Sequence, residues 1–388
     1  MSKQKICIIG DGLAGLTTAT ILSQQNICID LYSSGKIKSK TRDNRTTAIS
    51  NSNFQYIKNN LNLTKNNFFW SCKEINLFFE DKKQIINFFN FSEKNKNFMH
   101  IFQNKDFKKK LKKIISSKKN IKLIKKNIKI IKKNITSIDS ENSFVVLDKK
   151  KVFYDLIILS IGSLSQLYFK IEAGRSIKKN YEETAITGII NHNAKIENAS
   201  QFFLKEGPLA ILPFKKNAFS TVWSVSNNYF KTHEKDLKKI LIKKLSELLK
   251  TKKIKAPAHI QSFPINLNLK TKYFKKNILI LGDGLHTVHP IAGQGFNLVL
   301  RDIKKLSELM NKISKLGLLF KNSFLLKDFY NSRKPENNLF GIGINLTNVF
   351  FKDNKYFSIF KRGILNNINN FNFIKKISQT IADKGISQ

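Results

Sequence analysis

Three glycines near the amino terminus have the spacing of a turn that can hold a phosphate group. Gly10, Gly12 and Gly15 lie in the string GDGLAG, directly after the apolar run Ile6–Ile9 and before a helix-like stretch. The first glycine permits a tight turn, the second lets the backbone approach a pyrophosphate, and the third lets helix and strand pack closely. The amino end of the helix adds N–H donors and partial positive charge. Strand, turn and helix together predict a dinucleotide-binding site.

The acidic residue that usually binds a ribose hydroxyl in such a site is replaced here. It would fall near position 33, which holds Ser33. Asp30 is nearby, but on an extended strand the two side chains point to opposite faces, so Asp30 is a poor substitute. Either Ser33 donates and accepts hydrogen bonds in place of the acid, or ribose binding is weaker.

A second segment, residues 278–302, has the sequence ILILGDGLHTVHPIAGQGFNLVLRD. It places Asp283 just after an apolar run and a glycine-rich turn just before a helix. Asp283 can accept hydrogen bonds from ribityl hydroxyls. The backbone N–H groups of Gly295, Phe296 and Asn297 can stabilise negative charge on a reduced isoalloxazine ring. This segment predicts a site that can hold a flavin.

Metal-ligating residue types are present but poorly arranged. His286 and His289 have no further Cys, His or carboxylate at ligand spacing, so we expect local hydrogen bonding and no metal. Cys7, Cys28 and Cys72 form no CxxC pair, and the first two lie in apolar runs. This usage fits a reducing cytoplasm.

The apolar pattern predicts an α/β fold with two packed regions. The uninterrupted runs Ile6–Ile9, Leu156–Leu159 and Ile278–Leu281 are typical of central parallel strands, whose carboxyl ends carry the ligand. Between Glu172 and Pro264 the pattern changes to strand-like stretches, which predicts an inserted domain. We therefore expect a Rossmann-like, discontinuous FAD-binding domain, an inserted mainly β substrate domain, and C-terminal helices. The expected boundaries are 1–70, 100–171 and 271–332 for the first, 71–99 and 172–270 for the second, and 333–388 for the helices.

The formal charge of +42 over 388 residues is the most unusual bulk property. Lys, Asn, Ile and Phe are abundant in every region, as a coding bias would produce, and no nucleic-acid-binding motif accompanies them. We expect no specific nucleic-acid partner. The apolar run near the start is too short for a signal peptide and no run is long enough to span a bilayer, so membrane contact would be peripheral, at an anionic inner face.

The pairing of GDGLAG with GDGLHTVHPIAGQGFNL resembles the group A flavin monooxygenases. A narrower resemblance is to the ubiquinone-biosynthesis hydroxylases. Three strings carry it in the family's order: DNRTTAIS (43–50), FFLKEGPLAILPF (202–214) and SFPINL (262–267). The resemblance spans the chain from Ile6 to about Arg333.

The resemblance implies FAD as the cofactor, with the glycine turn at its ADP half. It also implies that Arg45 and Gln103 flank the cofactor, that Asp283 and Gly295–Asn297 hold the ribityl chain and ring, and that Pro290 faces the reactive edge. In the family, a flavin C4a-hydroperoxide transfers oxygen to a phenolic ring that carries a polyprenyl tail. NAD(P)H or a small redox protein supplies the electrons.

The sequence assigns no general base. The candidates for the substrate pocket are His289, Pro290, Phe214 and Trp223. For the two aromatic residues, ordinary core packing is an equal alternative.

Two turns depart from the family's pattern in addition to Ser33. Ile161-Gly162 stands where Asp-Gly is usual, and Gly284-Leu285 follows Asp283. Two alternatives to the hydroxylase therefore stay open. The chain is a non-catalytic subunit of a quinone-biosynthesis assembly, or it is a flavin monooxygenase of a different aromatic compound or an alkene. A homo-oligomer is compatible with either.

Overall fold

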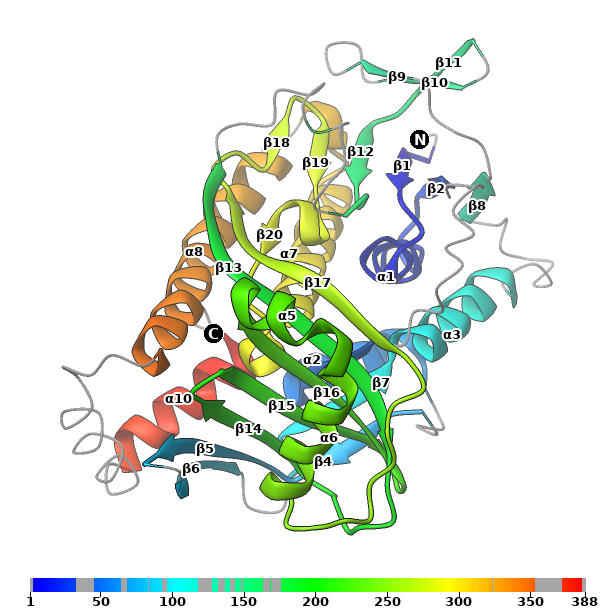
Figure 1. The fold of residues 1–388 in the computed structure, drawn as a ribbon. Helices are drawn as coiled ribbons and strands as arrows, with labels where there is room; N and C mark the ends of the chain where they lie inside the picture. Colours follow the sequence, from blue (N-terminus) through cyan, green and yellow to red (C-terminus); the bar gives the residue numbers. More distant parts are fainter. Residues whose placement is uncertain are drawn as a thin grey trace.

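The computed structural model consists of two large β-sheets with helices packed against them (Figure 1). The described residues are 3–32, 45–63, 68–82, 84–92, 96–117, 128–131, 137–139, 144–147, 149–162, 168, 176–322, 324–352 and 372–385. Ser33 lies outside them. In Figure 1 the first sheet lies in the upper part of the view, near the amino terminus, and the second sheet crosses the middle and lower part of the molecule.

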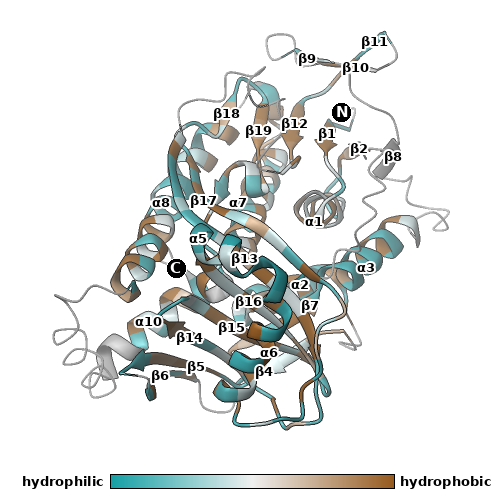
Figure 2. Cartoon of the chain, in the orientation of Figure 1, coloured by the Kyte–Doolittle hydropathy of each residue, from teal (hydrophilic) through white to brown (hydrophobic). Residues whose placement is uncertain are grey.

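The first sheet is built around the three apolar runs that predict central strands. Its order is β18-β19-β12-β1-β2-β8, and the strands from β19 to β8 are parallel while β18 is antiparallel. The strands are β1 (Lys5–Ile9), β2 (Cys28–Tyr32), β8 (Ile128–Ile131), β12 (Leu156–Leu159), β18 (Phe274–Lys275) and β19 (Ile278–Ile280). The hydropathy colours of Figure 2 show β1, β12 and β19 as hydrophobic. The predicted parallel α/β sheet is confirmed.

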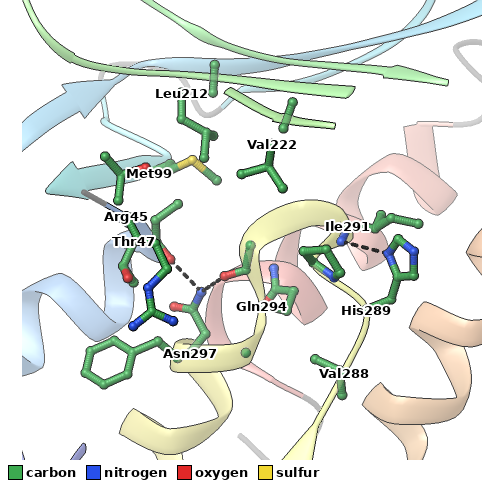
Figure 3. Close-up of a pocket in the computed structure, with 18 of the residues that line it drawn as sticks. Arg45, Thr47, Met99, Leu212, Val222, Val288, His289, Ile291, Gln294 and Asn297 are labelled. Atoms are coloured by element: carbon green, nitrogen blue, oxygen red, sulfur yellow. Dashed lines mark hydrogen bonds between the residues drawn. The ribbon is translucent and has the colours of Figure 1, made fainter. Parts of the chain in front are cut away.

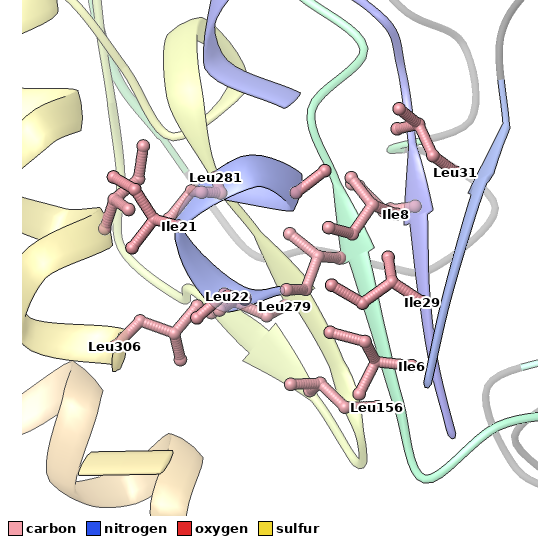
Figure 4. Packing of buried hydrophobic residues seen from close by; sticks show 14 of the residues in the cluster. Ile6, Ile8, Ile21, Leu22, Ile29, Leu31, Leu156, Leu279, Leu281 and Leu306 are labelled. Carbon is pink, nitrogen blue, oxygen red and sulfur yellow. The ribbon is translucent and has the colours of Figure 1, made fainter. Parts of the chain in front are cut away.

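Helices α1 (Leu13–Leu22) and α7 (Gly295–Lys315) cover this sheet. α1 is apolar and buried along nearly its whole length, as expected of a helix inside the molecule. Figure 4 shows Leu22 of α1 between Leu306 of α7 and Leu279 of the sheet. Burial of each such side chain stabilises the fold by roughly 1.5–3 kcal/mol, so this core fixes the position of the turn between β1 and α1.

The second sheet has eight strands in the order β20-β17-β13-β16-β15-β14-β5-β6. Its neighbouring strands are antiparallel except β14 and β5, which are parallel. The strands are β5 (Glu74–Asp81), β6 (Gln84–Ser92), β13 (Ser176–Asn191), β14 (Ala199–Leu204), β15 (Gly207–Lys215), β16 (Ala218–Ser226), β17 (Ile260–Lys270) and β20 (His286–Thr287). The predicted mainly β region is therefore one large antiparallel sheet joined by two strands from an earlier segment.

Helix α6 (Leu237–Leu248) covers the outer face of the second sheet. Leu237, Leu241 and Leu245 recur at every fourth position and are buried, whereas Lys238, Lys239 and Lys243 are exposed. The short helices α5 (Asn227–His233) and η1 (Glu234–Asp236) lead into it. The cavity described below lies on the other face of the sheet.

Two small sheets and two helices complete the first half of the chain. The elements are β3 (Thr46–Ser50), α2 (Asn51–Leu61), β4 (Trp70–Cys72), β7 (Met99–Gln103), α3 (Asn104–Ser117), β9 (Ser137–Asp139), β10 (Phe144–Leu147) and β11 (Lys150–Phe153). Strands β3, β7 and β4 form one small sheet, and β11, β10 and β9 form the other. Ser50 caps α2 by accepting a hydrogen bond from the backbone N–H of Asn53, and Asn62 ends the helix in the left-handed region at φ 47°.

Helices α8 (Leu325–Phe351) and α10 (Asn372–Lys384) form the C-terminal part that sequence periodicity predicts. A buried charged cluster ties α8 to α7. Asp302 accepts hydrogen bonds from Arg333 Nε at 2.7 Å and from His286 Nε2 at 2.6 Å. Burial acts to raise the pKa of Asp302, but Arg333 and His286 outweigh it and hold this pKa below its ordinary value. Asp302 therefore stays charged and anchors α8.

The element bounds can be compared with the expected domain boundaries. Strands β5 and β6 come from 71–99 and join the second sheet. However, the boundary at 332/333 falls inside α8. Strand β20, in the segment 271–332, pairs with β17 of the second sheet. The division into domains stays a prediction.

Candidate functional site

A cavity of about 670 Å³ lies between the carboxyl ends of the parallel strands and one face of the second sheet. This volume is typical of small-molecule sites, which measure about 300–1,000 Å³. Figure 3 shows Leu212 and Val222 of the second sheet facing the loop that carries Ile291 and the start of α7. The cavity is therefore where the fold predicts a ligand.

The glycine turn has the geometry that its sequence predicts. Gly10 has φ +117°, and a Cβ there would lie 2.2 Å from the backbone oxygen of Ser160. A Cβ at Gly15 would lie 1.9 Å from the backbone oxygen of Gly10, so helix and strand approach as closely as a glycine allows. Gly12 lines the cavity, with no heavy atom within 4 Å of its Cβ position. Two glycines thus serve packing, and Gly12 leaves room for a ligand.

Positively charged groups line the cavity near this turn. Arg45, which precedes β3, and Lys108 of α3 are among its lining residues. Lys112 Nζ lies 3.4 Å from Asp11 Oδ2, which places α3 beside the glycine turn. Together with the amino end of α1, these cations suit an anionic ligand such as a pyrophosphate.

Asp283 lines the cavity just after β19, and its side chain is exposed. The unusual Gly284 that follows has a structural reason, because a Cβ there would lie 1.9 Å from the hydroxyl oxygen of Tyr168. In the other divergent turn, Gly162 lines the cavity at φ +79°. In both divergent turns a residue still lines the cavity: Gly162 in the first and Asp283 in the second.

Asn297 holds together the loop, the helix start and strand β3. Its Nδ2 donates to the backbone oxygens of Ala48 at 3.1 Å and Gly293 at 3.2 Å. Its Oδ1 accepts from the backbone N–H of Ser50 at 2.9 Å and from Asn53 Nδ2 at 2.8 Å. Figure 3 shows the two Nδ2 bonds. The Asn297 side chain is buried and fully used, so it fixes the first turn of α7 against the cavity. Gly295 and Phe296 line the same wall.

His289 is locked in place by hydrogen bonds at both ring nitrogens. Nε2 lies 2.8 Å from Glu183 Oε2, and Nδ1 accepts from the backbone N–H of Ile291 at 3.3 Å. This network assigns the neutral tautomer with the proton on Nε2. A general base needs a free lone pair, and neither nitrogen of His289 offers one. The hydrogen bonding expected of His286 and His289 is present, to Asp302 and Glu183 respectively.

Glu183 connects this loop to the end of α8. Its Oε1 lies 2.6 Å from Lys352 Nζ. Burial acts to raise the pKa of Glu183, but the hydrogen bonds from His289 and Lys352 and the charge of Lys352 outweigh it and lower this pKa to about 2. The carboxylate stays ionised and holds His289. It thereby also positions the next residue, Pro290, which lines the cavity.

The wall formed by the second sheet is one row of residues across five strands. Backbone pairing places Leu77, Gln201, Ala210, Val222 and Thr187 side by side, and all five line the cavity. Because side chains alternate along a strand, these positions share one face of the sheet. The cavity is therefore mostly apolar on this side.

Five of the predicted site residues that the structure describes do not line the cavity: Gly10 and Gly15, which serve packing in the turn, and Gln103, Phe214 and Trp223. Gln103 is buried in β7, where it pairs with Thr46. Trp223 follows Val222 on β16, so it points to the opposite face and packs in the core beneath α6. Phe214 packs in a hydrophobic cluster with Cys72 and Met99 and is not among the residues that line the cavity. For both aromatic residues the structure favours the core-packing alternative.

Several lining residues were not anticipated from the sequence. Thr47, Met99 and Lys108 come from elements that were expected, but their orientation toward a ligand has no local signature. The same is true of Gln201. Glu183 supports the cavity wall through His289, and it has no local signature either, because this partner is distant in sequence. Alternation could have identified the two faces of each strand, though not which face borders a cavity.

The chain is similar in sequence to several known proteins. A family model described as squalene epoxidase matches residues 220–378. Ubiquinone hydroxylase UbiL of Rhodospirillum rubrum is 28% identical over 201 residues, which cover 50% of this chain and 46% of that protein. The mitochondrial ubiquinone biosynthesis monooxygenase COQ6 of Dictyostelium discoideum is 27% identical over 188 residues, covering 47% of this chain and 36% of that protein. The chain thus spans about half or less of the length of these curated relatives.

Solved structures show the same fold. A probable FAD-dependent monooxygenase of Pseudomonas aeruginosa, pqsL, superimposes with a TM-score of 0.75 at 16% identity, covering 91% of this chain and 97% of that one. The p-nitrophenol 4-monooxygenase PnpA of Pseudomonas putida gives 0.74 at 11% identity, covering 97% and 96%. At these identities the similarity concerns the fold alone. The predicted fold class is confirmed, and so is the resemblance to the ubiquinone-biosynthesis hydroxylases.

Proposed function

We propose that this chain, a relative of the ubiquinone-biosynthesis flavin hydroxylases, is an FAD-dependent monooxygenase that hydroxylates the ring of a polyprenylated phenol. The observation that carries the proposal is a single cavity bordered by a glycine turn with cationic groups on one side and by an apolar sheet face on the other. The first border suits a dinucleotide. The second suits an aromatic ring with an apolar tail.

The residues around the cavity fit FAD. Gly12, Arg45 and Lys108 would hold the pyrophosphate, Asp283 the ribityl hydroxyls, and the start of α7 at Gly295–Asn297 the ring. Once reduced by NAD(P)H or a small redox protein, bound FAD would activate O₂, so that one oxygen atom of O₂ enters the substrate and the other leaves as water. Gly10 and Gly15 act through packing, and Gln103 is a support for β3.

The chain's own residues keep this reaction dry and in register. Asn297 fixes the helix start, while Glu183 and His289 fix the loop at Pro290. Leu77, Val222 and the neighbouring apolar residues exclude water, which would otherwise divert the activated oxygen to hydrogen peroxide. No side chain is assigned as a general base.

Flavin uptake tests the proposal directly. Purified protein should be yellow or take up added FAD at micromolar concentration, measured by flavin absorbance and fluorescence. Asp283→Ala should weaken FAD binding by about tenfold, the value of one charge-assisted hydrogen bond. The matched change Asp328→Ala, on the exposed first turn of α8, should leave FAD binding unchanged. A wild-type protein that binds no FAD would overturn the proposal.

A second candidate is epoxidation of an isoprenoid alkene. The match to a squalene epoxidase model over residues 220–378 favours it. Both candidates use the same apolar cavity, and they differ in the group that receives oxygen. Mass spectrometry of products from a prenylated phenol would separate them, since ring hydroxylation and alkene epoxidation fragment differently. An Asp283→Ala variant that restored quinone production as fully as the wild type in a deletion strain would instead support a non-catalytic subunit.

We also propose peripheral contact with an anionic bilayer at an inner membrane face. Leu339, Ile342, Leu346 and Val349 are exposed on α8 at spacings of three and four residues, which forms one apolar stripe. The formal charge of +42 adds attraction to anionic lipid. Among the described residues, no helix has the length and apolar character to cross a membrane. Co-sedimentation with anionic vesicles, lost in Leu346→Asp, would test this contact.

A further inference from the structure

Gln201 is a buried amide on the apolar wall of the cavity. It lies on β14, is 5% exposed, and lines the cavity. Within the part of the chain that the structure describes, its side chain has no hydrogen-bond partner. It is therefore a polar group turned toward the ligand space without a protein partner.

The neighbours of Gln201 make this position distinct. Leu77, on one side of it in the row, and Ala210 and Val222, on the other, are apolar. Thr187, at the end of the row, is polar, but its hydroxyl donates to the backbone oxygen of Thr221 at 2.8 Å. Of the five side chains in this row, the Gln201 amide is therefore the one available to bind a polar atom of a ligand.

Because the Gln201 amide opens onto the cavity, a ligand that covers it must hydrogen-bond to it or leave it unpaired, which is unfavourable by about 1–3 kcal/mol. The amide offers both a carbonyl acceptor and an N–H donor. A phenolic hydroxyl can pair with the first and a ring methoxy or quinone oxygen with the second. A hydrocarbon of the same shape can pair with neither.

We propose that Gln201 is the specificity residue that binds an oxygen substituent of the aromatic substrate and thereby fixes which ring carbon faces the flavin. This inference rests on the proposed function. The sheet wall that carries Gln201 faces the loop at Pro290 and the start of α7, so the ring would lie between them. The amide then selects phenols over plain alkylbenzenes.

The test measures binding and not turnover. Flavin-loaded wild type, Gln201→Met and Gln84→Met are titrated with 4-propylphenol and with propylbenzene by isothermal titration calorimetry. Methionine keeps the length and flexibility of glutamine without its amide. Gln84 is an exposed glutamine at the edge of the same sheet and serves as the matched control. Melting temperature confirms that each variant is folded.

The wild type and Gln84→Met should prefer the phenol, and Gln201→Met should lose this preference by about tenfold. Gln201→Glu keeps an acceptor but has no N–H donor. This variant should still bind 4-propylphenol more tightly than it binds propylbenzene. An unchanged preference in folded, flavin-loaded Gln201→Met would overturn the role of Gln201. It would mean that the amide hydrogen-bonds to water in the cavity and not to the substrate. A wild type that takes up no flavin would instead overturn the proposed function.

Discussion

The cavity has a wall of turns and helix starts on one side and a wall of β-strands on the other, and the sequence specifies them differently. On the first side the ligand space is shaped by backbone, at Gly12, Gly162 and the start of α7. On the second side it is shaped by side chains such as Gln201 and Val222. A backbone wall requires glycine at fixed spacing, whereas a side-chain wall can be built from many residues. The first is conspicuous in sequence and the second is not.

The largest effect should come from breaking the backbone wall. Gly15→Ala puts a methyl group 1.9 Å from the backbone oxygen of Gly10, and neither can move without parting helix and strand. We expect a loss of about 4–5 kcal/mol in the free energy of unfolding, at the upper end for single substitutions, together with loss of FAD binding. Urea unfolding followed by circular dichroism measures the first and flavin fluorescence the second.

Gly12→Ala is the matched control for this change. Gly12 has φ −69°, which suits any residue, and its Cβ would meet open space. Stability should stay within about 1 kcal/mol of the wild type, while FAD affinity falls because the new methyl group stands in the ligand space. A Gly15→Ala protein as stable as Gly12→Ala would contradict the assignment of roles within the turn.

The same difference explains what could be predicted of the fold. Continuous apolar runs identified β1, β12 and β19 because parallel strands covered on both faces have no polar side. The glycine spacing identified the turn, since close backbone approach tolerates no other residue there. The joining of β5 and β6 to β14 could only be guessed, because pairing between distant strands leaves no local pattern.

A smaller effect, and a sharper one, should distinguish the two faces of the strand wall. Trp223→Ala empties a core site beneath α6 and should lower the free energy of unfolding by about 3–4 kcal/mol, with ligand preference unchanged. Val222→Ala should cost about 1 kcal/mol and weaken binding of 4-propylphenol. Chemical denaturation and calorimetry measure the two quantities. Weaker binding in Trp223→Ala alone would mean that the faces are reversed.

The candidate site was predicted in part for the same physical reason. The sequence pattern of residues 278–302 predicts a flavin site. Three residues of this segment, Asp283, Pro290 and Asn297, line the cavity. Phe214 and Trp223 were candidates for the substrate pocket, but the direction of each side chain is set by strand register, which no local pattern reveals. Glu183 could not be predicted from the sequence, because its role depends on His289 and Lys352, which lie near it only in the folded chain.

An effect smaller than that of Trp223→Ala concerns the seam between the two walls, where Glu183 of β13 holds His289 of the loop before α7. Because the folded-state pKa of Glu183 is lowered from 4.5 to about 2, its stabilisation is present above about pH 4.5 and is lost as pH falls toward 2. Glu183→Gln should therefore lower stability by on the order of 2 kcal/mol at pH 7, and the deficit should shrink with acid. Urea unfolding at pH 7, 4 and 3 measures this trend. Glu182→Gln, its exposed neighbour, should behave as the wild type, and a Glu183→Gln deficit that stayed constant with pH would show that the carboxylate's charge does not hold the seam.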